Sequence, residues 1–130
     1  MTTAAPQQPI PHPEEAAVRL PLELYMRGHA EDCAAHMRAA FLPSARLESV
    51  REGPLTSWTL DVYCQRFQNT PAADEALRRR RIDWLDITGT SAMAKVTLEH
   101  GAVTFTDYFV LLKTEAGWKI ANKAFHAQPQ

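Results

Sequence analysis

Apolar and polar residues alternate with a period of two along most of the C-terminal half of the chain, as expected for strands of a sheet. The alternating segments cover residues 77–88, 90–99, 102–114 and 117–127. Turn residues separate them: Gly89, the pair His100 and Gly101, and a short turn at 115–117 that ends in glycine. The pattern predicts a long antiparallel meander.

The N-terminal half instead carries apolar residues at helical spacing. A first helix is predicted from residue 14, and Pro21 either kinks it or marks its true start; its apolar positions are Val18, Leu22, Tyr25 and Met26. A second helix is predicted after Gly28 and ends at Pro43; its apolar positions are Cys33, Met37, Ala40 and Phe41.

A hairpin and a third helix complete this half of the chain. The segments "ARLESVRE" and "PLTSW" predict two strands that turn at Glu52 and Gly53. Thr59 suits the N-cap of the third helix, and Asp61 in its first turn is favoured by the helix dipole. Helices followed mostly by strands are typical of an α+β domain in which the helices pack on one face of the sheet.

The domain boundaries follow from length and composition. A chain of 130 residues has room for one domain with one core. Residues 1–13 hold four of the nine prolines and almost no large apolar side chain, which predicts a disordered tail. We therefore expect a single domain over residues 14–127.

The strand at 102–114 is apolar on both faces. One face carries Phe105, Asp107, Phe109 and Leu111, and the other carries Thr104, Thr106, Tyr108, Val110 and Leu112. Helices can cover only one side of this sheet, and large exposed apolar patches are unusual on monomers. A homodimer through the outer sheet face is therefore predicted.

Net charge and cysteine content indicate which classes of molecule the protein can bind and whether it holds a disulfide. The formal net charge is −1, so the chain as a whole attracts neither nucleic acid nor an anionic membrane. The basic run at 78–81 is flanked by acids and is predicted to be a solvated strand edge. No apolar run approaches the length of a membrane span, and the two cysteines lack C-x-x-C spacing. We expect a cytoplasmic protein without a disulfide, and small molecules as its partners.

The order helix, helix, hairpin, helix and long meander, together with "SARLESV", "FTDYFVLLK" and "GWKIANKAFH", resembles the nuclear transport factor 2-like superfamily. More narrowly, the chain resembles its SnoaL-like branch, whose members carry the label putative lumazine-binding. The resemblance covers residues 14–126. It implies the cystatin-like cone fold, in which three helices pack on a strongly curved, mostly antiparallel mixed sheet around a conical pocket.

The resemblance also implies a dimer that holds an apolar or aromatic small molecule and needs no cofactor. The superfamily includes isomerases, dehydratases, polyketide cyclases and binding proteins, so the fold does not choose among these activities.

Asp107 is the candidate catalytic residue. In an apolar pocket wall its carboxyl would lose hydration, which raises its pKa and suits it to act as a general acid or base. The superfamily's steroid isomerases use a protonated strand acid in this manner, and the 13-residue spacing from Asp107 to Ile120 looks similar to theirs. The alternative is a structural role, in which Asp107 pairs with Lys123 or Lys119 across the hairpin and fixes its register.

Seven residues are candidates for binding the ligand in the pocket: Tyr25, Trp58, Tyr63, Phe105, Phe109, Asn122 and His126. Tyr25 and Tyr63 also fit as core tyrosines, and His126 as a solvent-facing residue near the chain end. No metal site is predicted. His29, Asp32 and His36 share one side of a helix, but the histidines lie about 10 Å apart, which is too far for one ion.

Three functions remain open. The first is binding of a small apolar or aromatic molecule. The second is a cofactor-independent isomerase, dehydratase or cyclase with Asp107 as its acid or base. The third is a dimeric interaction module with a filled pocket. No G-x-S-x-G motif and no paired His and Cys are present, so covalent catalysis is not expected.

Overall fold

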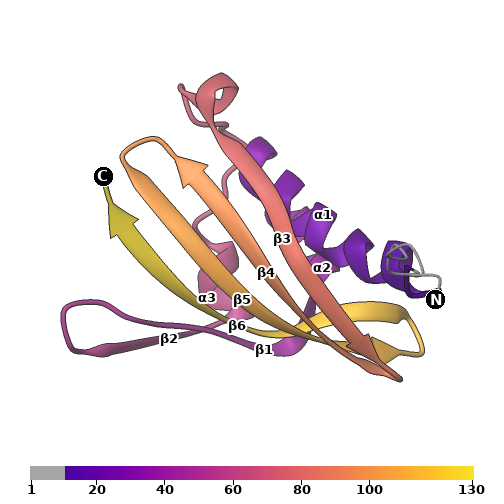
Figure 1. Cartoon of the computed structure of the whole chain (residues 1–130). Coiled ribbons are helices and arrows are strands. Elements are labelled where there is room, and N and C mark those ends of the chain that lie inside the picture. The colour runs from indigo at the N-terminus through magenta and orange to yellow at the C-terminus, as the bar shows by residue number, and fades with distance from the viewer. Residues whose placement is uncertain (1–10) are drawn as a thin grey trace, which may run out of the picture.

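The computed structural model describes residues 11–130, which form one layer of helices on one six-stranded sheet. The helices are α1 (Glu15–Glu31), α2 (Ala34–Ala40), α3 (Leu60–Cys64) and the short 3₁₀ helix η1 (Glu75–Leu77). The strands are β1 (Phe41–Val50), β2 (Leu55–Thr59), β3 (Arg79–Thr88), β4 (Ser91–His100), β5 (Val103–Thr114) and β6 (Gly117–Pro129). Figure 1 shows α1, α2 and α3 on one side of the curved sheet. The predicted α+β class is confirmed.

The sheet has the strand order β2-β1-β6-β5-β4-β3. Only β1 and β6 run parallel, and all other neighbours are antiparallel, so the mostly antiparallel mixed sheet is confirmed. The predicted hairpin is β1–β2. Most of the basic run lies at the start of the edge strand β3, where Arg79 and Arg81 are exposed.

The proline-rich tail predicted for residues 1–13 falls mostly on residues 1–10, which lie outside the described part of the chain. Within residues 11–130, no helix is both long enough and apolar enough to cross a bilayer. The cysteines in this range, Cys33 and Cys64, are free.

The first two helices differ from the prediction at Gly28, Pro21 and Pro43. Gly28 does not end α1, which continues to Glu31 and closes on Asp32 in the left-handed conformation. A Cβ on Gly28 would lie 2.8 Å from Met37 Cε, so this glycine lets α2 pack closely on α1. Pro21 lies inside α1 and does not mark its start. Because β1 already begins at Phe41, Pro43 lies in a strand.

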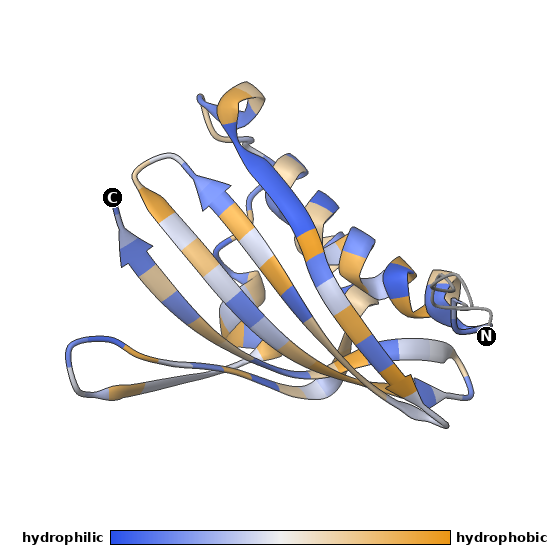
Figure 2. Ribbon diagram, in the orientation of Figure 1, coloured by the Kyte–Doolittle hydropathy of each residue, from blue (hydrophilic) through white to orange (hydrophobic). Residues whose placement is uncertain are grey.

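The core fills the space between the helices and the inner face of the sheet. Its largest fully buried apolar side chains are Val18, Leu22, Tyr25, Met37, Leu47, Val96, Leu98, Phe109, Leu111 and Ile120. No part of residues 11–130 covers the outer face of β3, β4 and β5, which carries apolar side chains that are 42–50% exposed: Trp84, Met93, Tyr108, Val110 and Leu112. In Figure 2 apolar and more polar residues alternate along the first half of β5, whereas its second half carries the apolar run 109–112, which puts apolar side chains on both faces.

A bulge in β6 changes which residues face inward. Val110 pairs with Asn122 and Leu111 pairs with Ile120, so Ala121 has no residue opposite it. Trp118 and Ile120 point into the core before the bulge, and Lys123 is buried after it. One extra residue therefore moves odd-numbered positions to the inner face and even-numbered positions outward.

Candidate functional site

A cavity of about 380 Å³ lies between the helices and the inner face of the sheet. Its wall is largely aromatic and includes Tyr25, Trp58, Tyr63, Phe67, Phe105 and Phe125. Asp107 and Lys123 line it and are only 1% and 5% exposed, whereas the lining residues Arg51 and Arg66 are exposed. The cavity thus has a buried polar end and a basic mouth.

Hydrogen bonds connect the polar groups at the buried end. The Tyr25 hydroxyl donates to Oδ2 of Asp107 at 2.6 Å and accepts a hydrogen bond from Nζ of Lys123 at 2.9 Å. Nζ also lies 3.5 Å from the Tyr63 hydroxyl, which is 3.3 Å from Nε2 of His29. Oδ1 of Asp107 is buried and has no hydrogen-bond partner among residues 11–130. Asp107, a residue that lines the cavity, therefore has one buried carboxyl oxygen whose hydrogen-bonding capacity is unused within the described part of the chain.

Three local features bring these side chains together. Tyr25 and His29 lie one turn apart on α1, so both rings reach the cavity. Thr59 caps α3 as predicted, with its side chain accepting from the Val62 N–H at 3.2 Å, and this helix presents Tyr63. The bulge in β6 turns Lys123 inward, toward the rings of Tyr25 and Tyr63.

Burial dominates the protonation of this end of the cavity. Loss of hydration raises the pKa of Asp107, although Lys123 and the Tyr25 hydroxyl oppose the change. It lowers the pKa of Lys123, which Asp107 opposes. Burial and the nearby Asp107 raise the pKa of both Tyr25 and Tyr63, so these remain neutral hydroxyls. The acid and the amine are both poorly hydrated, and burial brings their pKa values closer together, which favours proton exchange with a ligand.

Aromatic rings replace part of the hydration that Lys123 loses. Its Nζ lies 4.9 Å, 4.8 Å and 4.7 Å from the ring centres of Tyr25, Tyr63 and Phe125. At these distances the ring faces attract a cation. The amine therefore sits in an aromatic cage.

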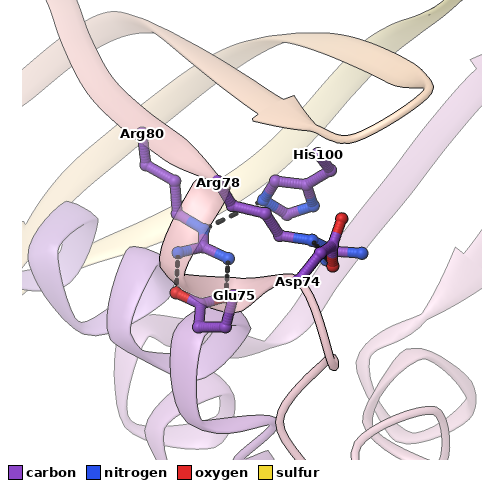
Figure 3. A network of polar contacts seen from close by, with 5 residues as sticks. All are labelled: Asp74, Glu75, Arg78, Arg80 and His100. Atoms are coloured by element: carbon purple, nitrogen blue, oxygen red, sulfur yellow. Dashed lines mark hydrogen bonds and ion pairs between the residues drawn. The ribbon is translucent and has the colours of Figure 1, made fainter.

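A second polar cluster holds His100 at the wall of the cavity. Figure 3 shows Arg80 between Glu75 and His100, with Arg78 beside Asp74. Two Arg80 nitrogens lie 2.7 Å from the Glu75 carboxylate, and Nε of Arg80 donates to Nε2 of His100 at 2.9 Å. Burial and Arg80 lower the pKa of His100 to about 4. His100 is therefore neutral at pH 7 and carries its proton on Nδ1.

The structure brings five of the predicted site residues together at the cavity: Tyr25, Trp58, Tyr63, Phe105 and Asp107. The position of Asp107 agrees in part with both interpretations, the pocket acid and the structural partner of a lysine. Asp107 lines the cavity, and it is also linked to Lys123, although through the Tyr25 hydroxyl and not directly. In the strand register Asp107 lies opposite Phe125, and Lys123 lies opposite Phe109.

Three predicted residues lie elsewhere. Phe109 is buried beneath the cavity, with its ring 5.0 Å from that of Tyr25. Asn122 accepts a hydrogen bond from the Arg46 N–H, and the exposed His126 contacts Gln128. The predicted pocket positions of Asn122 and His126 are wrong because the bulge turns both to the outer face.

The histidines and acid considered for a metal site separate in space. Asp32 caps two loop amides, those of Gln68 and Thr70, and His36 contacts Glu31, so only His29 reaches the cavity. Among the described residues, no group of three or more His, Cys, Asp or Glu side chains could hold a metal ion.

Sequence reasoning missed several cavity residues: His29, Arg51, Arg66, His100, Lys123 and Phe125. Lys123 and Phe125 alternate with polar or small residues, which indicates one inward face of β6, but the pattern alone does not fix which face that is.

The sequence model of the family described as "Putative lumazine-binding" matches residues 13–126. The chain belongs to this family. No curated protein matches it.

Solved structures have the same fold. A nuclear transport factor 2-like protein of unknown function from Shewanella baltica OS155 is 28% identical, over 90% of this chain and 95% of its own, with a TM-score of 0.80. A similar protein from Methylobacillus flagellatus KT is 29% identical, over 92% and 95%, with a TM-score of 0.77. A ketosteroid isomerase-like protein from Erwinia carotovora atroseptica SCRI1043 is 13% identical, over 91% and 98%, with a TM-score of 0.67, and shows the fold alone. The predicted superfamily is confirmed.

Proposed function

We propose that this protein binds a small apolar or aromatic molecule in the cavity. The observation that carries the proposal is a cavity with a largely aromatic wall that Asp107 also lines, together with the buried Oδ1 of Asp107, which has no partner among the described residues. Leaving such an acceptor unpaired costs about 1–3 kcal/mol. A ligand that donates a hydrogen bond to this oxygen would recover that energy.

The polar groups specify what the ligand must offer. Oδ1 of Asp107 needs an N–H or O–H donor, and Nζ of Lys123 can donate to a carbonyl oxygen. The rings of Trp58, Phe105 and Phe125 favour a flat aromatic body. A fused heteroaromatic ring with an N–H beside a C=O meets all three requirements, and the name of the family is consistent with such a ligand.

Thermal unfolding against pterins, lumazines, steroids and polyketide-like aromatics tests this function. A ligand at a hundred times its Kd should stabilise the folded state by about 2.7 kcal/mol. Trp58→Ala should remove the shift, because Trp58 lines the cavity. Trp84→Ala is the matched control, because Trp84 is 43% exposed on the outer face. The absence of any shift, or an equal shift in Trp58→Ala, would contradict the proposal.

The second candidate is a cofactor-independent isomerase, dehydratase or cyclase. The raised pKa of Asp107 and its unpartnered oxygen favour a general acid or base at this position. Once a ligand is known, Asp107→Asn should abolish its turnover and retain its binding. Unchanged turnover would leave Asp107 a structural residue.

A homodimer through the outer sheet face also remains a proposal. A shallow groove of about 190 Å³ runs across this face and is lined by apolar side chains that include Trp84, Met93, Tyr108 and Val110. A second copy of the chain would cover a patch of this kind. The cavity volume of about 380 Å³ favours ligand binding over an interaction module with a filled pocket.

A further inference from the structure

We propose that Lys123 forms an imine with an aromatic aldehyde or ketone bound in the cavity. The proposal rests on the proposed function for the site and adds a covalent step to it. Lys123 presents a primary amine to the cavity, is 5% exposed and is surrounded by three aromatic rings. A desolvated lysine in an aromatic pocket is a nucleophile for carbonyl compounds.

The hydrogen bonds around Lys123 suit a neutral amine. Its Nζ lies 2.9 Å from the Tyr25 hydroxyl oxygen and 3.5 Å from that of Tyr63, so a neutral amine can donate one N–H to each. The nitrogen lone pair then remains unused by these hydrogen bonds, on a residue that lines the cavity. Burial lowers the pKa of Lys123, which increases the fraction of the neutral form.

The reaction needs only groups that line the cavity. The lone pair of Nζ attacks the carbonyl carbon, the C=O π electrons move to oxygen, and a proton moves from nitrogen to that oxygen, which gives a carbinolamine. The C–O bond then breaks as the nitrogen lone pair forms C=N. The second nitrogen proton is lost, and the departing hydroxyl leaves as water after taking up a proton. The net change is amine plus carbonyl to imine plus water.

Asp107 and Tyr25 are placed to carry these protons. The hydroxyl of Tyr25 contacts both Nζ of Lys123 and Oδ2 of Asp107, at 2.9 Å and 2.6 Å, so it can relay a proton from nitrogen to the carboxyl group. Oδ1 of Asp107, without a partner among residues 11–130, can give a proton to the departing hydroxyl. The raised pKa of Asp107 allows this carboxyl to hold a proton.

The other lysines lie outside the cavity and serve as internal references. Lys119 donates to the carbonyl oxygen of Ala39 at 2.8 Å, and Lys113 pairs with Glu14 at 2.6 Å. Lys95 lies over the ring of Tyr108 on the outer face. Selective labelling of Lys123 would therefore reflect its position in the cavity and not the general reactivity of lysine side chains.

Reductive trapping tests the proposal on the full chain. The protein is incubated at pH 7 with benzaldehyde or naphthaldehyde and sodium cyanoborohydride, which reduces an imine to a stable secondary amine. Peptide mapping by mass spectrometry should find the adduct on Lys123 first and as the main product, ahead of Lys119, because only Lys123 lines the aromatic cavity. In urea this preference should disappear. Adducts spread over Lys95, Lys113 and Lys119, with Lys123 no faster than in urea, would overturn the proposal.

Two variants and one analogue complete the design. Lys123→Arg keeps a long basic side chain that has no primary amine and should lose the adduct, whereas Lys119→Arg should retain it. Naphthalenemethanol has no carbonyl group and reports binding alone. A thermal shift with the alcohol but no label on Lys123 would refute the imine and leave the binding function standing. Neither a shift nor a label would refute both.

Discussion

The Tyr25 hydroxyl donates a 2.6 Å hydrogen bond to Asp107, which lies 82 residues further along the chain. Tyr25 lies on α1 and Asp107 on β5, so this bond joins the helical layer to the sheet at the buried end of the cavity. The same hydroxyl accepts a hydrogen bond from Lys123 on β6. One tyrosine therefore connects a buried acid to a buried amine.

Replacement of Tyr25 by phenylalanine should destabilise the protein. The change removes the donor to Asp107 and the acceptor for Lys123, and leaving buried polar groups unpaired costs about 1–3 kcal/mol. The pKa of Asp107 should rise further, because the Tyr25 hydrogen bond opposes the effect of burial. Urea unfolding at pH 7 measures the change in free energy of unfolding.

Tyr108→Phe is the matched control for this substitution. Tyr108 is 50% exposed on the outer face, so its change should stay within about 0.5 kcal/mol. Equal stability of the two variants would mean that the Tyr25 hydroxyl does not hold the buried groups together.

Lys123 and Asp107 should be coupled in stability. Lys123→Met removes the buried donor to the Tyr25 hydroxyl and should destabilise the protein by about 1–3 kcal/mol at pH 8. Asp107→Leu removes the acceptor of the Tyr25 hydroxyl and should also destabilise. The double variant should lose less stability than the two single changes combined, because each group opposes the effect of burial on the other. Denaturant unfolding of all four proteins gives the coupling energy, and additive effects would contradict the prediction.

Much of the fold was predictable because its signals are local. The β1–β2 hairpin, the Thr59 cap and the four strands after residue 77 depend on turn residues and on alternation within a few positions. Gly28 was misinterpreted for a related reason. A glycine within a helical pattern indicates either an end or a close contact, and the contact is made by Met37, nine residues away.

The candidate site was predictable only up to the bulge in β6. The inward face of β5, which carries Asp107, has no register shift along its pairing with β4 and follows from simple alternation. On β6 the extra residue Ala121 reverses the alternation, which moved Asn122 outward and Lys123 inward. A bulge leaves no mark in a single sequence, so Lys123 could not be placed at the cavity beforehand.

Acid should destabilise the protein through His100. The unfolded histidine takes up a proton as the pH falls through 6.5, whereas the folded one, with a pKa of about 4, stays neutral until much lower pH. The unfolded state then binds more protons, so stability is lost as the pH falls from 6.5 toward 4. His29, whose pKa burial also lowers, contributes in the same direction.

The slope of Tm against pH between 7 and 4 measures this effect. His100→Gln retains a side-chain oxygen that can accept from Arg80 and removes the titration, so its slope should be shallower than that of the wild type. His126→Gln, at an exposed position, should keep the wild-type slope. Identical slopes for all three proteins would show that His100 is not held neutral by the fold.

Val110 should lie near the centre of the proposed dimer interface. It is 46% exposed on the outer face and pairs in the sheet with Met93 on one side and Asn122 on the other. In a twofold dimer Val110→Lys would bury two charges, so we expect the dimer Kd to rise at least about tenfold, or 1.4 kcal/mol. Sedimentation velocity over a concentration series measures the dimer Kd.

Leu20→Lys is the control, since Leu20 is 60% exposed on α1, which lies on the helical side of the sheet. A wild-type Kd in Val110→Lys would place the interface elsewhere, and a monomeric wild-type protein would remove the dimer altogether.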